Sequence, residues 1–311
     1  MAARAWGLEQ KAVEEVFFQN DAVSLCMLIH RRAKTMRVID FRAGPTSAKR
    51  LFVMSIAQRE GIRKVFTLVE REEVPTWHKL GFAKEAHIPL FYKRSDALVL
   101  GCAVPPAGER GADAPLQSET RIAIADRKGV APASESLERM EHTLAAGKRG
   151  LKDIAEKLPP VKITAIAEPE ARRAVVVAQR GARALTGFDP FGRDVERRYF
   201  SVAVRGGFEL VSSVESQACF GSVLLELLQS PRTPAEKVAT AAALRGLSDT
   251  LLREGAVSCF SLAPSDDAEL ASVFLHNGFR RTGLLHDHLA VAGARKDAIV
   301  FSRKLAVPSD E

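Results

Sequence analysis

The chain has 311 residues, of which 46% are hydrophobic and 27% are charged, and its formal net charge is +7. This length allows two cores of ordinary size, and the composition is typical of a globular protein rather than a disordered one. No apolar run approaches the roughly 20 residues that cross a bilayer, and no signal-peptide core precedes the first strand. We therefore expect no membrane partner and a cytoplasmic location.

The positive charge is spread along the chain rather than gathered into one segment. Only two tyrosines and two tryptophans are present to interleave with it. Because nucleic-acid surfaces usually cluster basic residues among stacking aromatics, we do not expect a nucleic-acid partner. The four cysteines stand singly, without the spacing of a metal or redox site, so we also expect no metal.

Residues 1–102 alternate short apolar runs with turn residues. We predict strands over 12–18, 23–29 and 36–41, a helix over 48–60, a strand over 65–69, a short helix over 74–80, and strands over 86–92 and 97–100. Thr46 is well placed to cap the first helix. The basic residues near this turn suit an anion, but we interpret the turn as a plain cap with a solvated basic face.

Residues 103–160 differ in composition from the segments on either side. Proline and glycine punctuate this stretch, and large apolar residues become scarce. We interpret it as a linker that contains a strand near 121–125 and a polar helix near 134–158.

Residues 161–311 return to the earlier alternation. We predict strands over 162–166, 198–204, 208–214, 222–228, 256–262, 280–289 and 298–302, and helices over 169–185, 234–253 and 266–277. Strands that meander and then alternate with helices predict an α/β (α+β) sheet covered by helices.

The two outer segments share a pattern. Each has Arg-Glu-Gly before an apolar strand, then Gly-Phe, then Asp-Ala before a closing strand, at 59–61, 81–82 and 96–97 in the first and at 253–255, 278–279 and 297–298 in the second. Two such copies predict two related lobes rather than a solenoid, which needs three or more repeats.

The order of elements in the second lobe resembles the GNAT superfamily of N-acetyltransferases. Nearly the whole chain is similar to the β-lysine N6-acetyltransferases, through Glu85 to Tyr92 in the first lobe and through Asn277–Phe279, Thr282–Leu285 and Lys296–Phe301 in the second. The resemblance implies two tandem GNAT-like lobes, each a mixed central sheet flanked by helices. The first would be degenerate and the second would carry the activity.

The resemblance also implies a site for acetyl-CoA where the strand over 222–228 meets the following helix. The residues that correspond to this site are Leu228, Gln229, Arg232, Thr233, Ala235 and Lys237. In the superfamily this turn is rich in glycine, so that the backbone can approach the pyrophosphate. Here it has no glycine, and Thr233 to Glu236 instead has the pattern of a capping box with proline at the first helical position. We therefore expect a degenerate coenzyme site.

Two further features are candidates for the acceptor side. Glu226 lies within an apolar strand, where the β-lysine group carries an acid, and would act as the base that removes a proton from an amine. His286 and His288 would share one face of a strand and contact the substrate. The tyrosine that commonly protonates the leaving thiolate in the superfamily has no counterpart after Ala256.

Three hypotheses remain open at this point. The first is an acyl-CoA-dependent N-acetyltransferase that acts on a small amine or amino acid. The second is a catalytically inactive protein of the same fold that binds a protein partner. The third is an enzyme with another acyl donor, such as an aminoacyl-tRNA, which the positive charge allows but no motif supports.

Overall fold

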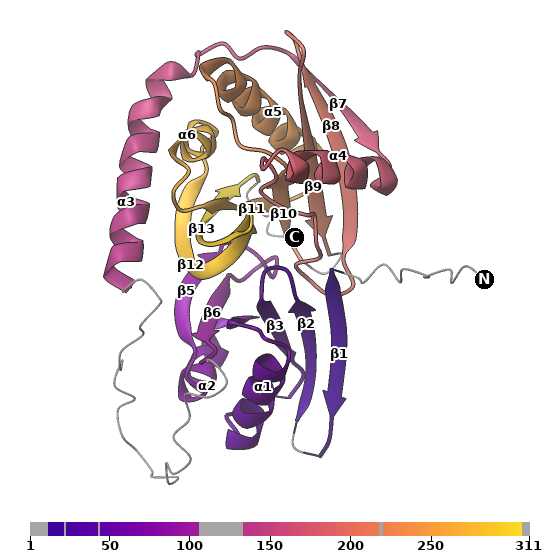
Figure 1. Ribbon diagram of the computed structural model, residues 1–311, viewed down its shortest axis with the longest axis vertical. Coiled ribbons are helices and arrows are strands. Elements are labelled where there is room, and N and C mark those ends of the chain that lie inside the picture. The colour runs from indigo at the N-terminus through magenta and orange to yellow at the C-terminus, as the bar shows by residue number, and fades with distance from the viewer. Residues whose placement is uncertain (1–11, 22, 43, 106–132, 218–219, 307–311) are drawn as a thin grey trace, which may run out of the picture.

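The computed structural model describes residues 12–21, 23–42, 44–105, 133–217 and 220–306. Their strands form one 13-stranded mixed sheet with the order β1-β2-β3-β4-β6-β5-β12-β13-β11-β10-β9-β8-β7, which runs through both lobes (Figure 1). The strand predicted near 121–125 lies outside the described residues. Within the described ranges, no helix combines the length and the apolar character needed to cross a membrane.

The first lobe follows the predicted order of elements. It comprises β1 (Val13–Gln19), β2 (Ser24–His30), β3 (Thr35–Asp40), α1 (Ser47–Arg59), β4 (Lys64–Val69), the 3-10 helix η1 (Arg71–Glu73), α2 (Val74–Lys79), β5 (Ala83–Ile88) and β6 (Ala97–Ala103). β5 lies earlier than predicted. It ends before Pro89, which has no N–H to donate, and Leu90 turns the chain with a φ of 55°.

The second lobe contains the remaining strands and three helices. It comprises β7 (Val161–Ile166), α4 (Glu168–Arg180), β8 (Glu196–Val204), β9 (Phe208–Ser216), β10 (Ser222–Leu227), α5 (Pro234–Arg253), β11 (Ser258–Pro264), α6 (Ala268–His276), β12 (Arg280–Val291) and β13 (Ala294–Lys304). α4 ends five residues earlier than predicted, with Gly181 as its C-cap.

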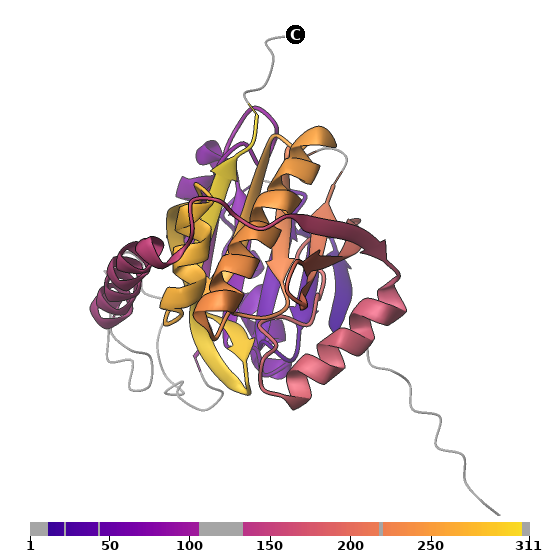
Figure 2. The same ribbon diagram turned by 90° about the horizontal axis from the view of Figure 1, so that it is seen from above.

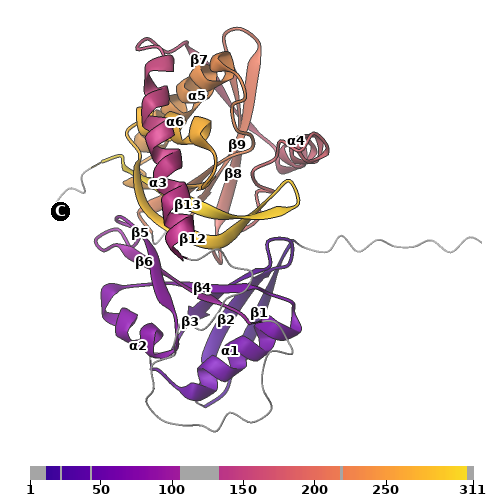
Figure 3. The same ribbon diagram turned by 60° about the vertical axis from the view of Figure 1, so that its left-hand side comes forward.

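Helix α3 (Ala133–Arg149) precedes the second lobe, and the short 3-10 helix η2 (Gly150–Asp153) follows it. The helix runs along the side of α6 (Figures 1 and 3), and Met140 is buried in the core of the second lobe. α3 ends before the predicted boundary, because the chain tightens into η2 at Gly150.

The strand order of one lobe mirrors that of the other. Read towards the junction, the last four strands are β3-β4-β6-β5 in the first lobe and β10-β11-β13-β12 in the second. β3 and β4 are parallel and connected through α1, as β10 and β11 are through α5. The shared glycines after these helices, Gly61 and Gly255, both have positive φ. The prediction of an α/β fold with two lobes, each a mixed sheet flanked by helices, is confirmed.

α1 covers one face of the first lobe's half of the sheet and α5 one face of the second lobe's half, whereas α4 packs on the opposite face of the second half, against Tyr199 and Leu228 (Figures 2 and 3). Alternation along β3 places Met36 and Val38 in the core beneath α1, and alternation along β10 places Leu225 and Leu227 in the core beneath α5. A third cluster joins the lobes. It includes Phe66, Ile88 and Phe91 from the first lobe and Leu224, Phe260 and Val300 from the second.

The two half-sheets are joined by one antiparallel pair, Ala86 of β5 and Gly283 of β12. The backbones approach so closely that a Cβ added to Gly283 would lie 2.2 Å from the Ala86 Cβ and 2.3 Å from its Cα. Only glycine fits here without moving one lobe relative to the other.

We predict that Gly283→Ala destabilises the protein by about 1–3 kcal/mol, because the added methyl overpacks a backbone contact that cannot give way. Urea unfolding measures this. Gly181→Ala is the matched control, since the nearest atom to its added Cβ would be 3.7 Å away. Equal effects of the two substitutions would contradict the tight junction.

Candidate functional site

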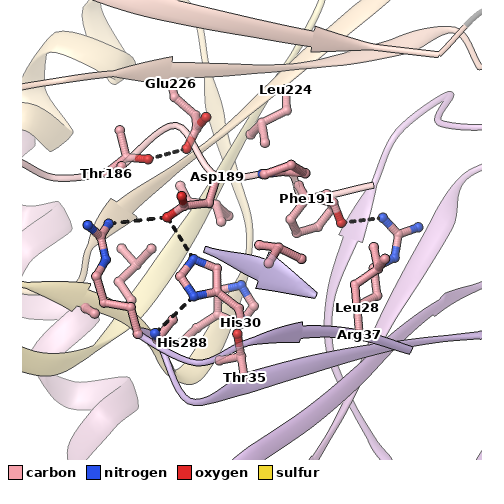
Figure 4. A pocket seen from close by; sticks show the side chains of 18 of the residues that line it. Leu28, His30, Thr35, Arg37, Thr186, Asp189, Phe191, Leu224, Glu226 and His288 are labelled. Atoms are coloured by element: carbon pink, nitrogen blue, oxygen red, sulfur yellow. Dashed lines mark hydrogen bonds and ion pairs between the residues drawn. The ribbon is translucent and has the colours of Figure 1, made fainter. Parts of the chain in front are cut away.

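A cavity of about 90 Å³ lies between the lobes, and both lobes contribute to its walls (Figure 4). The first lobe supplies the face of β2 and β3 that points away from α1, including Leu28, His30, Thr35 and Arg37. The second lobe supplies Leu224 and Glu226 from β10, Leu262 from β11, His288 from β12, and the segment 185–191 that follows α4.

A hydrogen bond between His30 and Asp189 connects the lobes at this cavity. The His30 Nε2 lies 2.9 Å from an Asp189 carboxylate oxygen, and the His30 Nδ1 accepts the backbone N–H of Ala33 at 3.1 Å. This second bond makes Nε2 the donor to Asp189. Burial would raise the pKa of Asp189, but the His30 bond and the nearby charges of Arg32 and Arg172 hold it below its usual value. The Asp189 carboxylate is thus paired with His30, Arg32 and Arg172.

Glu226, the predicted base, lies on the cavity wall with a side chain 16% exposed. Its Oε1 accepts the Thr186 hydroxyl at 2.5 Å, and its Oε2 accepts Arg197 at 2.5 Å and the Ser213 hydroxyl at 2.9 Å. Burial alone would lower the pKa of Arg197, but the charges of Glu226 and Glu215 raise it. A carboxylate accepts about four hydrogen bonds, so one position of Glu226 is left for a ligand.

The two histidines predicted to contact substrate do not lie together. β12 has an irregularity between Leu285 and Leu289, and Asp287 within it has a φ of 49°, so the alternation that would put both rings on one face is broken. His288 lines the cavity and is 6% exposed, whereas His286 is not among the lining residues. The His286 carbonyl instead accepts the ammonium of Lys64 at 2.7 Å.

His288 is a buried neutral histidine. Its ring stands edge-on to Phe66, with 4.8 Å between ring centroids, and its Nδ1 has no hydrogen-bond partner among the described residues. Burial, together with the charges of Lys64, His30 and Arg295, keeps its pKa well below 6.5.

The residues expected to hold coenzyme A are engaged with the protein itself. The Thr233 hydroxyl accepts the N–H of Glu236 at 3.1 Å, and the Glu236 carboxylate accepts the backbone N–H of Arg232 at 2.8 Å. This differs from the predicted capping box, in which Glu236 would accept from Thr233. Arg183, just after α4, pairs with Glu236 at 3.1 Å.

The other expected coenzyme residues are also occupied. Leu228 donates its N–H to Val211 and its carbonyl accepts from Leu185, and Gln229 forms a β-bridge with Ala184. The Lys237 ammonium is buried and pairs with Glu269 at 2.5 Å and Asp153 at 3.2 Å. Ala235 lies in the first turn of α5. Because a carboxylate already lies at the start of α5, these residues do not fit a pyrophosphate.

The matching turn of the first lobe was interpreted as a cap with a solvated basic face, and half of that interpretation is wrong. Thr46 caps α1 as expected, accepting the N–H of Lys49 at 3.3 Å. Lys49 itself is 1% exposed, and its ammonium bonds to Asp40 and to the carbonyls of Arg42 and Gly44. A basic side chain here folds back to neutralise a neighbouring acid rather than facing solvent.

No group of three or more His, Cys, Asp or Glu side chains in the part of the chain that the structure describes could hold a metal ion. Sequence reasoning missed His30, Arg37, Thr186 and Asp189. Thr186 and Asp189 lie in a Gly- and Pro-rich segment, and His30 and Arg37 lie in the other lobe, so no local pattern relates them to Glu226.

No family model and no curated protein matches the chain. Solved structures do resemble part of it. The ribosomal-protein-S18-alanine N-acetyltransferase from Escherichia coli is 15% identical, and the match covers 49% of this chain and 97% of that one, with a TM-score of 0.37. A spermidine N-acetyltransferase from Vibrio cholerae, solved with CoA and spermine, is 12% identical over 47% and 95%, also with a TM-score of 0.37. Both are N-acetyltransferases.

We predict that His288 makes stability fall as the pH is lowered. Unfolded histidine takes up a proton as the pH drops through about 6.5, while folded His288 stays neutral, so the unfolded state binds more protons. The free energy of unfolding should therefore decrease by up to about 1.4 kcal/mol per pH unit between about pH 6 and 5 from this group.

Urea unfolding of the wild type and of His288→Gln across this range measures the effect, and the variant should show the shallower slope. His78→Gln, at an exposed histidine, should keep the wild-type slope. If all three slopes were equal, His288 would not be buried in its neutral form.

Proposed function

We propose that this protein binds a small amine-bearing metabolite in the cavity between its lobes, and that coenzyme A does not bind at the start of α5. The resemblance of the sequence to the GNAT acetyltransferases supports an amine as the ligand. The observation that carries the proposal is Glu226, whose carboxylate faces the cavity with one acceptor position open.

The surroundings of Glu226 suit a fixed binding group. Its three hydrogen bonds come from three different elements: β8 supplies Arg197, β9 supplies Ser213, and the segment after α4 supplies Thr186. A carboxylate held in this way is already oriented when a ligand arrives, so little conformational entropy is lost on binding. A ligand amine would donate the fourth hydrogen bond to the Glu226 carboxylate.

The contacts at the start of α5 support the second part of the proposal. Arg183 and the Arg232 N–H hold the Glu236 carboxylate, so an incoming phosphate would have to displace an anion already in place. Pro234 has no N–H to offer, and the N–H of Glu236 is taken by Thr233. A helix start favours anions because its N–H groups and dipole are free, and here both are largely satisfied.

Acyl transfer to the bound amine is a second candidate, favoured by one observation. β10 and β11 pair only from Ser222 and Ser258 to Leu224 and Phe260, and beyond this point both strands contribute to the cavity, through Glu226 and Leu262. An acyl group entering between separated strands would meet the amine there. Calorimetric titration with acetyl-CoA separates the two candidates. Micromolar binding of acetyl-CoA, together with formation of an acetylated amine, would establish acyl transfer.

We predict that ethylamine binds the wild type with millimolar affinity and binds Glu226→Gln at least about tenfold more weakly, because a hydrogen bond to a charged acceptor is lost. Calorimetry or ligand-observed NMR measures the two dissociation constants. Glu196→Gln, at an exposed glutamate, is the control and should bind like the wild type. Equal affinity in all three proteins would exclude Glu226 as the amine acceptor.

We also predict that Glu236→Ala loses about 1 kcal/mol of stability, because the Arg232 N–H and Arg183 lose their acceptor. Wild-type protein should show no heat of binding with millimolar coenzyme A. Thermal unfolding and calorimetry measure these quantities, with Glu196→Ala as the stability control. Micromolar binding of coenzyme A to the wild type would refute the closed site.

A further inference from the structure

A second cavity lies where β3 and β4 end, and we call it the β3–β4 cavity. It is larger than the cavity that Glu226 lines, with about 290 Å³ against about 90 Å³. The parallel pairing of the two strands stops at Val38 and Thr67, and the strand ends beyond this point form part of the lining. The apolar residues of the lining include Ile39, Phe41, Leu68, Val69 and Phe220. A ligand here would therefore contact mainly apolar and aromatic side chains.

Most polar residues of the β3–β4 cavity already have partners within the protein. Those with an ion pair or a side-chain hydrogen bond to another residue are Arg37, Asp40, Thr67, Arg193, Asp194 and Gln217. The other three polar residues of the lining are Glu73, Trp77 and Tyr92. Their chemistry decides what the cavity is able to recognise.

Trp77 brings a buried donor to the wall of the cavity. Its side chain is 2% exposed, and its ring packs edge-on against Phe82 with 4.8 Å between the ring centroids. Among the described residues, its indole N–H has no hydrogen-bond acceptor. A buried tryptophan N–H usually has a partner, because leaving it unpaired destabilises the fold. An acceptor on a ligand in the cavity would supply this partner.

Glu73 lies one helical turn before Trp77. It has helical backbone angles, with a φ of −85° and a ψ of −17°, and precedes α2 directly. Residues four apart in a helix lie on the same face, with about 5–6 Å between their Cβ atoms. The Glu73 Oε2 accepts the N–H of Glu70 at 3.2 Å, and a carboxylate has about four acceptor positions, so several are left for a ligand. An acceptor and a donor thus lie within reach of one small ring.

Tyr92 adds a hydroxyl to the same wall. Burial raises its pKa to about 12, and the nearby charge of Glu73 raises it as well, although Arg37 acts in the opposite direction. The hydroxyl therefore keeps its proton at neutral pH, and it has no hydrogen-bond partner in the described ranges. The Ser95 hydroxyl donates to Glu70 at 2.5 Å, which holds the loop that carries Tyr92 against the start of α2.

The three groups together select for a ligand with a donor and an acceptor on one edge of a flat body. A simple amine has no acceptor for Trp77, and a carboxylate would be repelled by Glu73. A nucleobase carries an N–H group beside a carbonyl or a ring nitrogen. Proteins that bind an unstacked base hydrogen-bond this edge and hold the ring between aromatic and apolar side chains. The apolar lining of the β3–β4 cavity suits such a ring.

We propose that the β3–β4 cavity binds a single nucleobase, whose N–H donates to Glu73 and whose adjacent carbonyl or ring nitrogen accepts from Trp77. The Tyr92 hydroxyl donates to a further acceptor of the base. The volume of about 290 Å³ lies just below the roughly 300–1,000 Å³ of sites for drug-sized ligands, which suits one base or its nucleoside. This second site does not depend on the function proposed for the cavity at Glu226.

Four probes test the proposal on the full chain by ligand-observed NMR. Adenine, cytosine and uracil each carry an N–H group beside an acceptor. The fourth probe, 1,3-dimethyluracil, keeps the ring and both carbonyls of uracil and has no N–H. At least one of the three bases should bind with a dissociation constant below about 1 mM, and 1,3-dimethyluracil should bind at least about tenfold more weakly than that base.

Two variants test the two groups that are easiest to change. Glu73→Gln should weaken binding of the base at least about tenfold, because the charged acceptor is lost. Glu72→Gln, at the exposed neighbouring glutamate, is the matched control and should bind like the wild type. Tyr92→Phe should weaken binding about threefold or more. This variant guards against a folding defect, since the free protein loses no hydrogen bond with the hydroxyl and should unfold at the wild-type temperature.

Three results would overturn the proposal. If none of the three bases binds at millimolar concentration, the cavity is not a site for a nucleobase. If 1,3-dimethyluracil binds as tightly as the best base, the cavity takes up apolar rings without reading their edge. If Glu73→Gln and Tyr92→Phe both keep the wild-type affinity, the base binds elsewhere on the protein.

Discussion

The pairing of Ala86 with Gly283 is the contact on which the rest of the architecture depends. It is one residue pair wide, yet it makes two half-sheets into one sheet and fixes how far apart their inner faces lie. The cluster around Phe66, Leu224 and Phe260 fills most of the space between those faces. Where β2 and β3 face the end of β10, the apolar filling gives way to the polar cavity.

Charge pairing inside this protein follows one rule. Buried cations are matched with acids from neighbouring elements, and each match fixes a loop or a helix end: Lys49 holds the turn before α1, and Lys237 links α5 to α6 and η2. The same principle holds at the start of α5, where the Glu236 carboxylate pairs with Arg183 and accepts the backbone N–H of Arg232.

Much of the fold follows from the sequence because it is encoded locally. Alternating apolar residues locate the strands, and Thr46 and Thr233 mark the starts of α1 and α5 correctly. The errors lie where local pattern and backbone geometry disagree. β12 has the alternation of a regular strand, and only its irregularity at Asp287 separates His286 from His288. The single sheet was not predicted, because a one-residue pair between lobes leaves no trace in either sequence segment.

The site was less predictable than the fold for the same reason. Glu226 stood out as an acid in an apolar strand, and alternation places it on the cavity face. Arg37 in a strand of the first lobe looks like one more dispersed basic residue. Its place in the wall of the cavity depends on the arrangement of both lobes, which no local pattern shows.

Lys49 and Glu236 occupy equivalent positions, three residues after the capping threonine of matching helices, and they carry opposite charges. Each folds back onto the turn before its own helix, one to bind an acid and two carbonyls, the other to bind an N–H and an arginine. Two identical subunits would have to carry the same residue at both places. A chain that holds both lobes is free of this symmetry, so each half can specialise without compromising the other.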